Sequence, residues 1–343
     1  MASQTLFIIH KHRHGFFVKA IYSNHLSVLY NFAKTVTIYS RNPNVKYGAG
    51  SPKTYAVNLE GQNQLGFLAS CFDRFMTYLR NFGYKENNYE IIDFEYGLSA
   101  PMHLEFSDNI ELREGEQEAA VNFFFEKNPF LTVLPLPTGR GKTITAKFCA
   151  DRLGARFSVV AADKHIDNWY NSLCSNTKID KSRIIICNGK NVPLWRLMDD
   201  INAGYDDFDV LFLSNTTLDN YIKAFTSGDV VAMRKYRYSP EQFYNKARIA
   251  LEITDEGHEM LHQVVKRMII MPVRHRLVTT ASTKTKKHDD NRIIDLVYPV
   301  QCRFTEFEEN DHVVIHYLLY NFIGLEQSMY KTNFGYNHNR LEK

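Results

Sequence analysis

The stretch Leu136-Pro137-Thr138-Gly139-Arg140-Gly141-Lys142-Thr143 decides the fold. It follows a strand-like apolar run, Phe130–Leu136, and opens an expected helix, Ile144–Leu153. A strand, a glycine-containing loop and a helix in this order form a phosphate site, because backbone N–H groups converge at the helix N-terminus. We expect the Lys142 ammonium to contact the β and γ phosphates of a nucleotide and the Thr143 hydroxyl to bind Mg²⁺. Leu136 stands where the usual pattern GxxxxGK[ST] has its first glycine.

Short apolar runs of strand length recur along the chain beyond residue 105. They are separated by segments of helix length, which is typical of parallel strands joined by crossover helices. The expected fold class is therefore α/β, with a parallel sheet flanked by helices. The expected strands are Phe130–Leu136, Phe157–Ala162, Arg183–Cys187, Asp209–Ser214, Ile249–Thr254 and Arg276–Thr279.

An acidic motif, Asp255-Glu256-Gly257-His258, follows the expected strand Ile249–Thr254. Acids at the end of a second strand complete a phosphate site. We expect Asp255 to hold Mg²⁺ through water and Glu256 to polarise the water that attacks the γ-phosphate. We expect His258 to link the nucleotide to the rest of the protein. Taken alone, these four residues are also compatible with an ordinary polar strand end.

Two further segments are candidates for contacts with this site. Thr279-Thr280-Ala281-Ser282 follows the next strand, and its small polar residues could bond to the acids and sense the nucleotide, or form a plain Ser/Thr turn. Thr280, Ala281 and Ser282 are the candidate coupling residues. Gln117 lies on an expected helix, Gly115–Glu126, where it could read the adenine edge or simply face solvent.

Charge is unevenly distributed along the chain. The 41 Lys and Arg residues exceed the 38 Asp and Glu residues by only +3, yet residues 1–59 contain seven cations and no acid. Such a local positive field suits a polyanion such as nucleic acid, although small domains can also carry a charge bias. The aromatic residues of this region lie in alternating, strand-like segments, so we assign them to a core. Arg41 and Lys46, in a turn-rich segment, are the candidate DNA contacts.

The chain divides into three expected parts. Residues 1–105 form a small basic α+β DNA-binding domain, residues 106–301 the nucleotide-binding domain, and residues 302–343 a connection toward a further domain. The linker is expected at Gly97–Pro101. The expected elements of the first part are strands Thr5–Ile9, Gly15–Tyr22, Lys34–Tyr39 and Thr54–Asn58 and an amphipathic helix over Leu65–Phe82.

Composition excludes several classes of protein. The longest apolar runs are far shorter than the roughly 20 residues that cross a bilayer, and the N-terminus lacks a signal-peptide pattern. The five cysteines form no CxxC pair, so we interpret them as reduced core thiols of a cytoplasmic protein. His10, His12 and His14 alternate, but with no thiol or carboxylate nearby we expect a solvated basic patch rather than a zinc site.

The motifs together resemble the first RecA-like core of superfamily 2 helicases, in their DExH-box branch. Within that branch the chain is most similar to the phage UvsW-type recombination helicases, because segments 42–48 and 81–85 of the N-terminal part also resemble theirs. The resemblance covers about residues 25–300. The motifs that carry it are, in order, Gln117, the 136–143 stretch, Asp255-Glu256-Gly257-His258 and Thr279-Thr280-Ala281-Ser282.

The resemblance implies a function. It implies an ATP-dependent DNA helicase or translocase that uses ATP and Mg²⁺ to unwind or branch-migrate branched, forked or D-loop DNA in recombination and repair. It also implies residence in the cytoplasm, that of a bacterial host if a phage encodes the chain. By the same resemblance, Asp163, Lys164, Ser214 and Thr216 touch the DNA backbone.

Helicases of this type hydrolyse ATP between two RecA-like domains, and the second domain contributes an arginine. Such an arginine is worth roughly 10³–10⁵ in rate. The 343 residues contain no second RecA-like pattern. We therefore expect that domain to act in cis or in trans, and this chain alone to be weak or inactive.

Two other interpretations remain open at the level of sequence. One is a DNA-binding module whose nucleotide site is regulatory or vestigial. The other is the motor part of a restriction-type translocase, although no nuclease-like cluster is convincing in this sequence.

Overall fold

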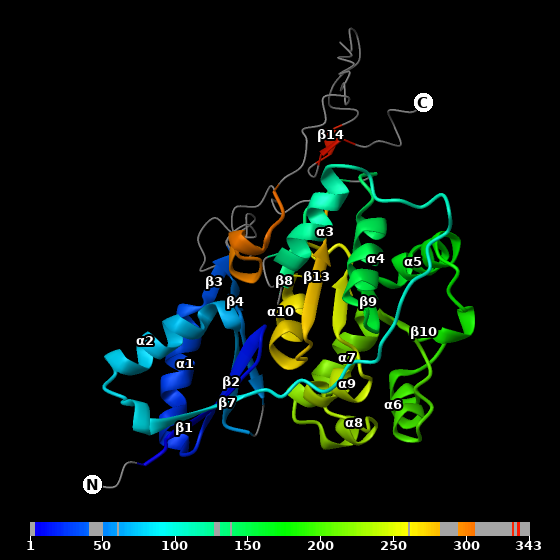
Figure 1. Ribbon diagram of the computed structural model, residues 1–343. Helices are drawn as coiled ribbons and strands as arrows, with labels where there is room; N and C mark the ends of the chain where they lie inside the picture. Colours follow the sequence, from blue (N-terminus) through cyan, green and yellow to red (C-terminus); the bar gives the residue numbers. More distant parts are fainter. Residues whose placement is uncertain are drawn as a thin grey trace. The chain divides into compact units, whose positions relative to one another are not determined.

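The computed structural model of the chain describes residues 4–40, 51–59, 62–126, 131–137, 139–259, 261–281, 294–305, 331–332 and 335–336. The chain divides into two compact units, residues 1–307 and 308–343. In the second unit, β14 (Lys331–Thr332) and β15 (Gly335–Tyr336) form an antiparallel pair. The first unit contains the two larger sheets and the helices that pack on them (Figure 1).

A six-stranded parallel sheet forms the centre of the part that the sequence predicts to bind a nucleotide, with strand order β10-β11-β9-β12-β13-β8. All six expected strands are present, and their ends lie within two residues of the expected ones. The fold is a RecA-like α/β fold, as expected. The strands are β8 (Leu131–Leu134), β9 (Phe157–Ala161), β10 (Ile184–Cys187), β11 (Val210–Ser214), β12 (Leu251–Thr254) and β13 (His275–Thr279).

Helices cover both faces of this sheet because successive strand residues point to opposite sides. On one face, Phe157, Val159 and Ala161 pack in one cluster with α3 (Glu116–Glu126), α4 (Lys142–Leu153) and α5 (Asp163–Asn176). On the other face, Val160 and Leu211 pack in a cluster with a second group of helices. That group is α6 (Leu194–Asn202), α7 (Asn215–Thr226), α9 (Pro240–Lys246) and α10 (Leu261–Ile270), and α8 (Val230–Arg234) contacts α7.

The N-terminal part contains a five-stranded mixed sheet with the order β5-β6-β2-β1-β7. Its pairs are antiparallel except for β1 with β7. Two helices pack together beside it through Phe32 and Phe75, whose ring centroids lie 4.9 Å apart. The elements are β1 (Phe7–Lys11), β2 (Gly15–Ala20), α1 (Leu26–Thr35), β5 (Ala56–Leu59), β6 (Gln64–Leu68), α2 (Phe72–Asn81) and β7 (Tyr89–Asp93), with β3 (Thr37–Ser40) and β4 (Ser51–Thr54) as a separate pair.

Two expected elements of this part are wrong. The helix expected over Leu65–Phe82 begins at Phe72, because residues 64–68 form β6, which pairs with β2 and β5. The strand expected over Lys34–Tyr39 begins at Thr37, because α1 continues to Thr35. In both cases tertiary pairing and packing override the local pattern.

Helix α10 packs against both sheets. Gly15 in β2 and Gly66 in β6 lie so close to it that an added Cβ would stand 2.9 Å from Ile269 Cα and 2.4 Å from Ile269 Cγ2, respectively. The buried residues of the small sheet therefore belong to the same cluster as those of α7 and α10. The domain boundary near residue 105 stays a prediction.

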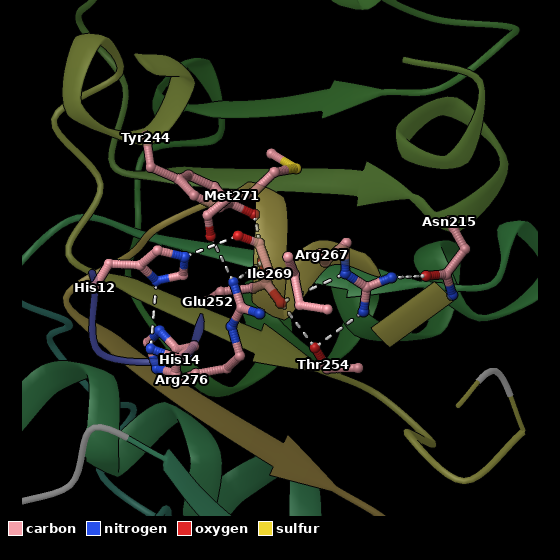
Figure 2. Close-up of polar contacts among 10 residues, drawn as sticks. All are labelled: His12, His14, Asn215, Tyr244, Glu252, Thr254, Arg267, Ile269, Met271 and Arg276. Carbon is pink, nitrogen blue, oxygen red and sulfur yellow. Dashed lines mark hydrogen bonds and ion pairs between the residues drawn. The ribbon is translucent and has the colours of Figure 1, made fainter. Parts of the chain in front are cut away.

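The three N-terminal histidines do not form the expected solvated patch. His12 and His14 are only 7% and 1% exposed. His12 Nε2 donates to Ile269 O at 2.8 Å, and His12 Nδ1 accepts from the His14 backbone N–H at 3.3 Å (Figure 2). Burial lowers the pKa of His12 to about 4, so the imidazole is neutral at pH 7 and the expectation of a charged surface is wrong for this residue.

Four of the five cysteines lie in the core. Cys71, Cys149, Cys187 and Cys302 are buried and unbridged, as expected of core thiols, and Cys174 is partly exposed. No helix among the described residues combines the length and apolar content that spanning a bilayer requires.

The close approach of β2 to α10 can be tested with glycine substitutions. Gly15→Ala should lower the free energy of unfolding by about 1–3 kcal/mol, since its Cβ would lie 2.9 Å from two backbone atoms, Ile269 Cα and Phe67 O. Gly189→Ala is the matched control, because no atom lies within 4 Å of its added Cβ, and its effect should stay within about 0.5 kcal/mol. Urea unfolding of both variants measures the difference. Equal stability of wild type and Gly15→Ala would contradict the packing described.

Candidate functional site

A cleft of about 410 Å³ lies at the carboxyl ends of the parallel strands. This edge is where open α/β sheets bind ligands, since loops and helix N-termini converge there. Residues from the loop after β8 and from the loop after β12 line the same cleft. The residues expected from sequence that line it are Gly139, Gly141, Lys142, Thr143, Asp255 and Glu256.

One ion pair joins the two motifs. Lys142 Nζ lies 2.9 Å from Glu256 Oε1, with side chains 12% and 20% exposed. The strands that lead to these residues, β8 and β12, are not neighbours, because β13 lies between them. The Lys142 side chain therefore meets the acidic loop across the end of β13, where Thr279 and Thr280 are placed.

The glycine loop has a conformation that requires glycine. Gly141 has φ +82° and would, with a Cβ, stand 2.3 Å from Gln117 Nε2. Gln117 is 3% exposed and clamps α3 to this loop. Its Oε1 accepts from the Arg113 backbone N–H at 2.9 Å, and its Nε2 donates to Arg140 O at 2.9 Å. Gln117 thus adjoins the phosphate loop, and its contact with adenine stays a prediction.

The acidic loop is also tightly shaped. The Asp255 backbone N–H donates to Val160 O at 2.9 Å, and Glu256 has φ +45°, an unusual value for a residue with a Cβ. Gly257 has no room for a side chain, since a Cβ would stand 2.4 Å from Val278 Cγ1. The Tyr298 hydroxyl donates to Gly257 O at 3.0 Å. Backbone strain of this kind is common at functional sites.

The two carboxylates of this loop have different partners. Thr279 Oγ1 donates to Asp255 Oδ1 at 3.1 Å, and His165 Nδ1 lies 3.4 Å from Asp255 Oδ2. Glu256 Oε2 accepts from the Ala281 backbone N–H at 3.1 Å, while its Oε1 faces Lys142. Burial by itself would raise the pKa of the Glu256 carboxyl, but the hydrogen bond and charge of Lys142 hold it below its usual value. Glu256 is therefore ionised at neutral pH.

The expected coupling residues lie against the acidic motif. His258 Nδ1 is 2.7 Å from Thr280 Oγ1 and 3.3 Å from Glu256 Oε2. With the Ala281 N–H on Glu256, two of the three expected residues contact the motif, Thr280 through His258 rather than an acid, and their coupling role stays a prediction. Ser282 and Thr138 lie outside the described residues.

The geometry also suits Mg²⁺. Thr143 and Asp255 present a hydroxyl and a carboxylate to the same cleft. Mg²⁺ binds in such sites through one or two protein oxygens together with waters and substrate phosphates, so these two residues fit the ion.

Sequence reasoning missed three residues of α5, and it placed Thr279 in the segment that could bond to the acids without counting it among the coupling residues. His165, Asn168 and Trp169 line the cleft, and Thr279 bonds to Asp255. The sequence did contain a signal for the α5 residues, because α5 begins directly after a buried strand and residues 165 and 169 share a helix face. Their nearness to Asp255 depends on β9 and β12 being neighbours, which the sequence does not show.

Four of the six expected DNA contacts lie at the N-termini of α5 and α7. Asp163, Lys164 and Thr216 are exposed, and Thr216 Oγ1 donates to Asp163 Oδ2 at 3.2 Å. Ser214 is 1% exposed, and its hydroxyl caps α7 by accepting from the Thr217 N–H at 3.2 Å. Arg41 and Lys46 lie outside the described residues. The contacts with DNA stay predictions.

Helix α4, which carries Lys142, is anchored to α5 by a buried lysine. Lys147 is 0% exposed, and its Nζ donates to Ser172 O and Oγ at 2.8 Å and to Asn176 Oδ1 at 2.6 Å. None of these partners carries a charge. Burial accordingly lowers the pKa of the Lys147 amine to about 7.

No protein-family model and no curated protein sequence matches the chain. Among solved structures it is similar to the UvsW helicase from bacteriophage T4, at 12% identity over 84% of this chain and 97% of that chain, with a TM-score of 0.47. It is also similar to the Pyrococcus furiosus Hef helicase domain, at 17% identity over 53% of this chain and 36% of that chain, with a TM-score of 0.36. The Sulfolobus solfataricus SWI2/SNF2 ATPase core in complex with dsDNA is 14% identical over 58% of this chain and 37% of that chain, with a TM-score of 0.35. These are likenesses of fold.

Lys147 should make stability depend on pH. The pKa of Lys147 is about 7 in the folded protein and about 10.4 in the unfolded chain. Between these pH values the amine is neutral when folded and protonated when unfolded, so unfolding takes up a proton. Raising the pH makes this uptake less favourable and stabilises the folded state. The free energy of unfolding of wild type relative to Lys147→Met should therefore increase from pH 7 to pH 10. Urea unfolding across this range measures it. Lys246→Met, on an exposed lysine, should show no such trend, and a flat difference for Lys147→Met would contradict the assignment.

Proposed function

We propose that the chain binds ATP and Mg²⁺ in the cleft, hydrolyses ATP, and acts as the motor half of a DNA helicase or translocase. One observation carries the proposal. Lys142 and Glu256, from motifs far apart in sequence, meet at 2.9 Å in a cleft that Thr143 and Asp255 also line. This is the set of a phosphate-binding ammonium, two metal-binding oxygens and an activating carboxylate that phosphoryl transfer to water requires.

Different residues of the cleft would bind the phosphates and the metal ion. The N-terminus of α4 and the Lys142 ammonium attract the phosphates, which compete with Glu256 for that ammonium. Thr143 and Asp255 would hold Mg²⁺, which when bound neutralises phosphate charge and orients the phosphates. Thr279 and His165 orient the Asp255 carboxylate for this role.

Glu256 is the candidate for activating water. Its Oε2 is held by the Ala281 N–H, so the carboxylate keeps one fixed orientation. Once a phosphate binds the Lys142 ammonium in place of Glu256, Glu256 Oε1 can accept a hydrogen bond from a water, orient that water and receive its proton. His258, in contact with both Glu256 and Thr280, would link this step to the end of β13.

The DNA part of the proposal rests on charge and resemblance. Residues 1–59 combine seven cations with no acid, which suits the phosphate backbone. The proposed substrates are branched, forked or D-loop DNA, and the proposed outcome is unwinding or branch migration. A second RecA-like domain, in cis or in trans, would contribute the arginine that stabilises charge on the γ-phosphate.

Substitutions in the cleft test the ATPase proposal. Lys142→Ala should lower ATP turnover in the presence of forked DNA about 10²–10³-fold and weaken the binding of a fluorescent ATP analogue. Glu256→Gln should lower turnover about 10²–10⁴-fold while the analogue still binds. Lys246→Ala, on an exposed lysine of α9, is the control and should change neither.

Unchanged turnover and binding in Lys142→Ala would overturn the proposal. Fork binding that ignores both substitutions, by a wild-type chain that neither binds the analogue nor hydrolyses ATP, would favour a DNA-binding module with a vestigial nucleotide site.

Charge reversal in the N-terminal part tests the DNA contact. The double variant Arg41→Glu, Lys46→Glu should weaken fork binding by a similar factor for different sequences. It should also reduce the slope of log K against log salt by about 1.8, since each lost phosphate contact releases about 0.9 fewer counterions. Fluorescence anisotropy at several salt concentrations measures both quantities. An unaltered slope would assign these two residues to another role.

A further inference from the structure

A buried polar cluster (Figure 2) joins residues of β12, the strand that leads into the acidic motif, to Arg267 of α10. We call it the Glu252 network. Glu252 and Arg276 are 0% exposed and Arg267 is 1% exposed. The network comprises Asn215, Tyr244, Glu252, Thr254, Arg267 and Arg276.

The Glu252 carboxylate is paired and hydrogen-bonded without Arg267. Arg276 Nη2 lies 3.3 Å from Glu252 Oε2, and the Tyr244 hydroxyl donates to the same oxygen at 2.7 Å. Thr254 Oγ1 donates to Glu252 Oε1 at 3.0 Å. Burial alone would raise the pKa of the Glu252 carboxyl, but the charges of Arg276 and then Arg267, with these hydrogen bonds, hold it below its usual value.

Arg267 adds a second buried cation against one carboxylate. Its Nε lies 3.5 Å from Glu252 Oε1, a longer separation than that of Arg276. Within the described residues, Arg267 Nε and Arg276 Nε and Nη1 have no hydrogen-bond partner. An excess buried charge opposes folding, so charge balance does not explain why an arginine occupies this position.

The hydrogen bonds of Arg267 join two loops of the site edge. Its Nη1 donates to Asn215 Oδ1 at 2.8 Å, and its Nη2 donates to Thr254 Oγ1 at 3.2 Å. Asn215 is the first residue of α7 and precedes Thr216, which bonds to Asp163 at the start of α5. Thr254 is the last residue of β12 and precedes Asp255.

We propose that Arg267 is a positioning residue that couples DNA contact at the N-termini of α5 and α7 to the acidic loop. The inference rests on the proposed function, together with the DNA contacts expected at Asp163, Lys164 and Thr216, and adds a physical link between DNA contact and the ATP cleft. A guanidinium is planar, so its two terminal nitrogens move together. A shift of Asn215 when a phosphate backbone binds beside Thr216 therefore moves the hydrogen bond to Thr254 and with it the position of Asp255.

The test removes the link at its outer end, away from the catalytic groups. Asn215→Ala deletes the acceptor for Arg267 Nη1, whereas Asn215→Asp keeps an acceptor there and offsets the excess cation. The measurement is the affinity for a fluorescent ATP analogue, and ATP turnover, with and without saturating forked DNA. Coupling between two sites is commonly worth about 5–150-fold. Wild type should show such an effect of DNA, Asn215→Ala should lose it with its DNA-free values unchanged, and Asn215→Asp should retain it.

Arg267→Lys provides a second test, since an ammonium keeps the charge but lacks the rigid planar fork that holds Asn215 and Thr254 in fixed positions relative to each other. It should lose the DNA effect as Asn215→Ala does, and urea unfolding of each variant shows whether it is folded. A DNA effect retained in Asn215→Ala, or lost equally in Asn215→Asp, would overturn the inference alone. A wild-type chain that binds the analogue without any effect of DNA would also overturn the inference alone. A wild-type chain that binds no analogue would overturn the proposed function and this inference with it.

Discussion

The buried carboxylate of Glu252 is the constraint on which much of the structure depends. A carboxylate with no exposed surface must be neutralised by partners inside the protein. Arg276 from β13 supplies the neutralising charge, and Arg267 from α10 adds a second guanidinium 3.5 Å from Glu252, so β12, β13 and α10 meet at this carboxylate. Helix α10 then presents its opposite side to the small sheet, where Gly15 and Gly66 allow the close approach. The helix that contacts this buried charge therefore also contacts the small sheet.

The same arrangement places the candidate active site. Strand β13 separates β8 from β12, and its carboxyl end brings Thr279 and Thr280 between the phosphate loop and the acidic motif. Lys142 crosses this gap to Glu256, which keeps both charges paired inside a cleft that is only partly open to water. The strained loop at Glu256 and the absence of a side chain at Gly257 hold the carboxylates in place.

The sequence predicted the strands of the large sheet, but it did not predict where α2 begins or that His12 is buried. The strands of the large sheet were predictable because both of their faces are buried, which leaves short runs of apolar residues. The helix expected over Leu65–Phe82 was wrong at its start because Leu65 and Leu68 fit a helical spacing, although the pairing of β6 with β2 decides their conformation. His12 was expected at the surface, yet its hydrogen bond to Ile269 and its neutral state depend on α10, more than 250 residues later in the chain.

By itself the sequence determined the local structures that contiguous motifs encode. The phosphate loop, the acidic motif and the order of strands and helices were predictable, because a strand, a turn and a helix N-terminus are local structures. Only the tertiary structure decided that His165 adjoins Asp255, that Gln117 clamps the phosphate loop, and that Arg267 joins Asn215 to Thr254. These contacts follow from strand order and from the burial of charge between layers, and neither leaves a periodic pattern in the chain.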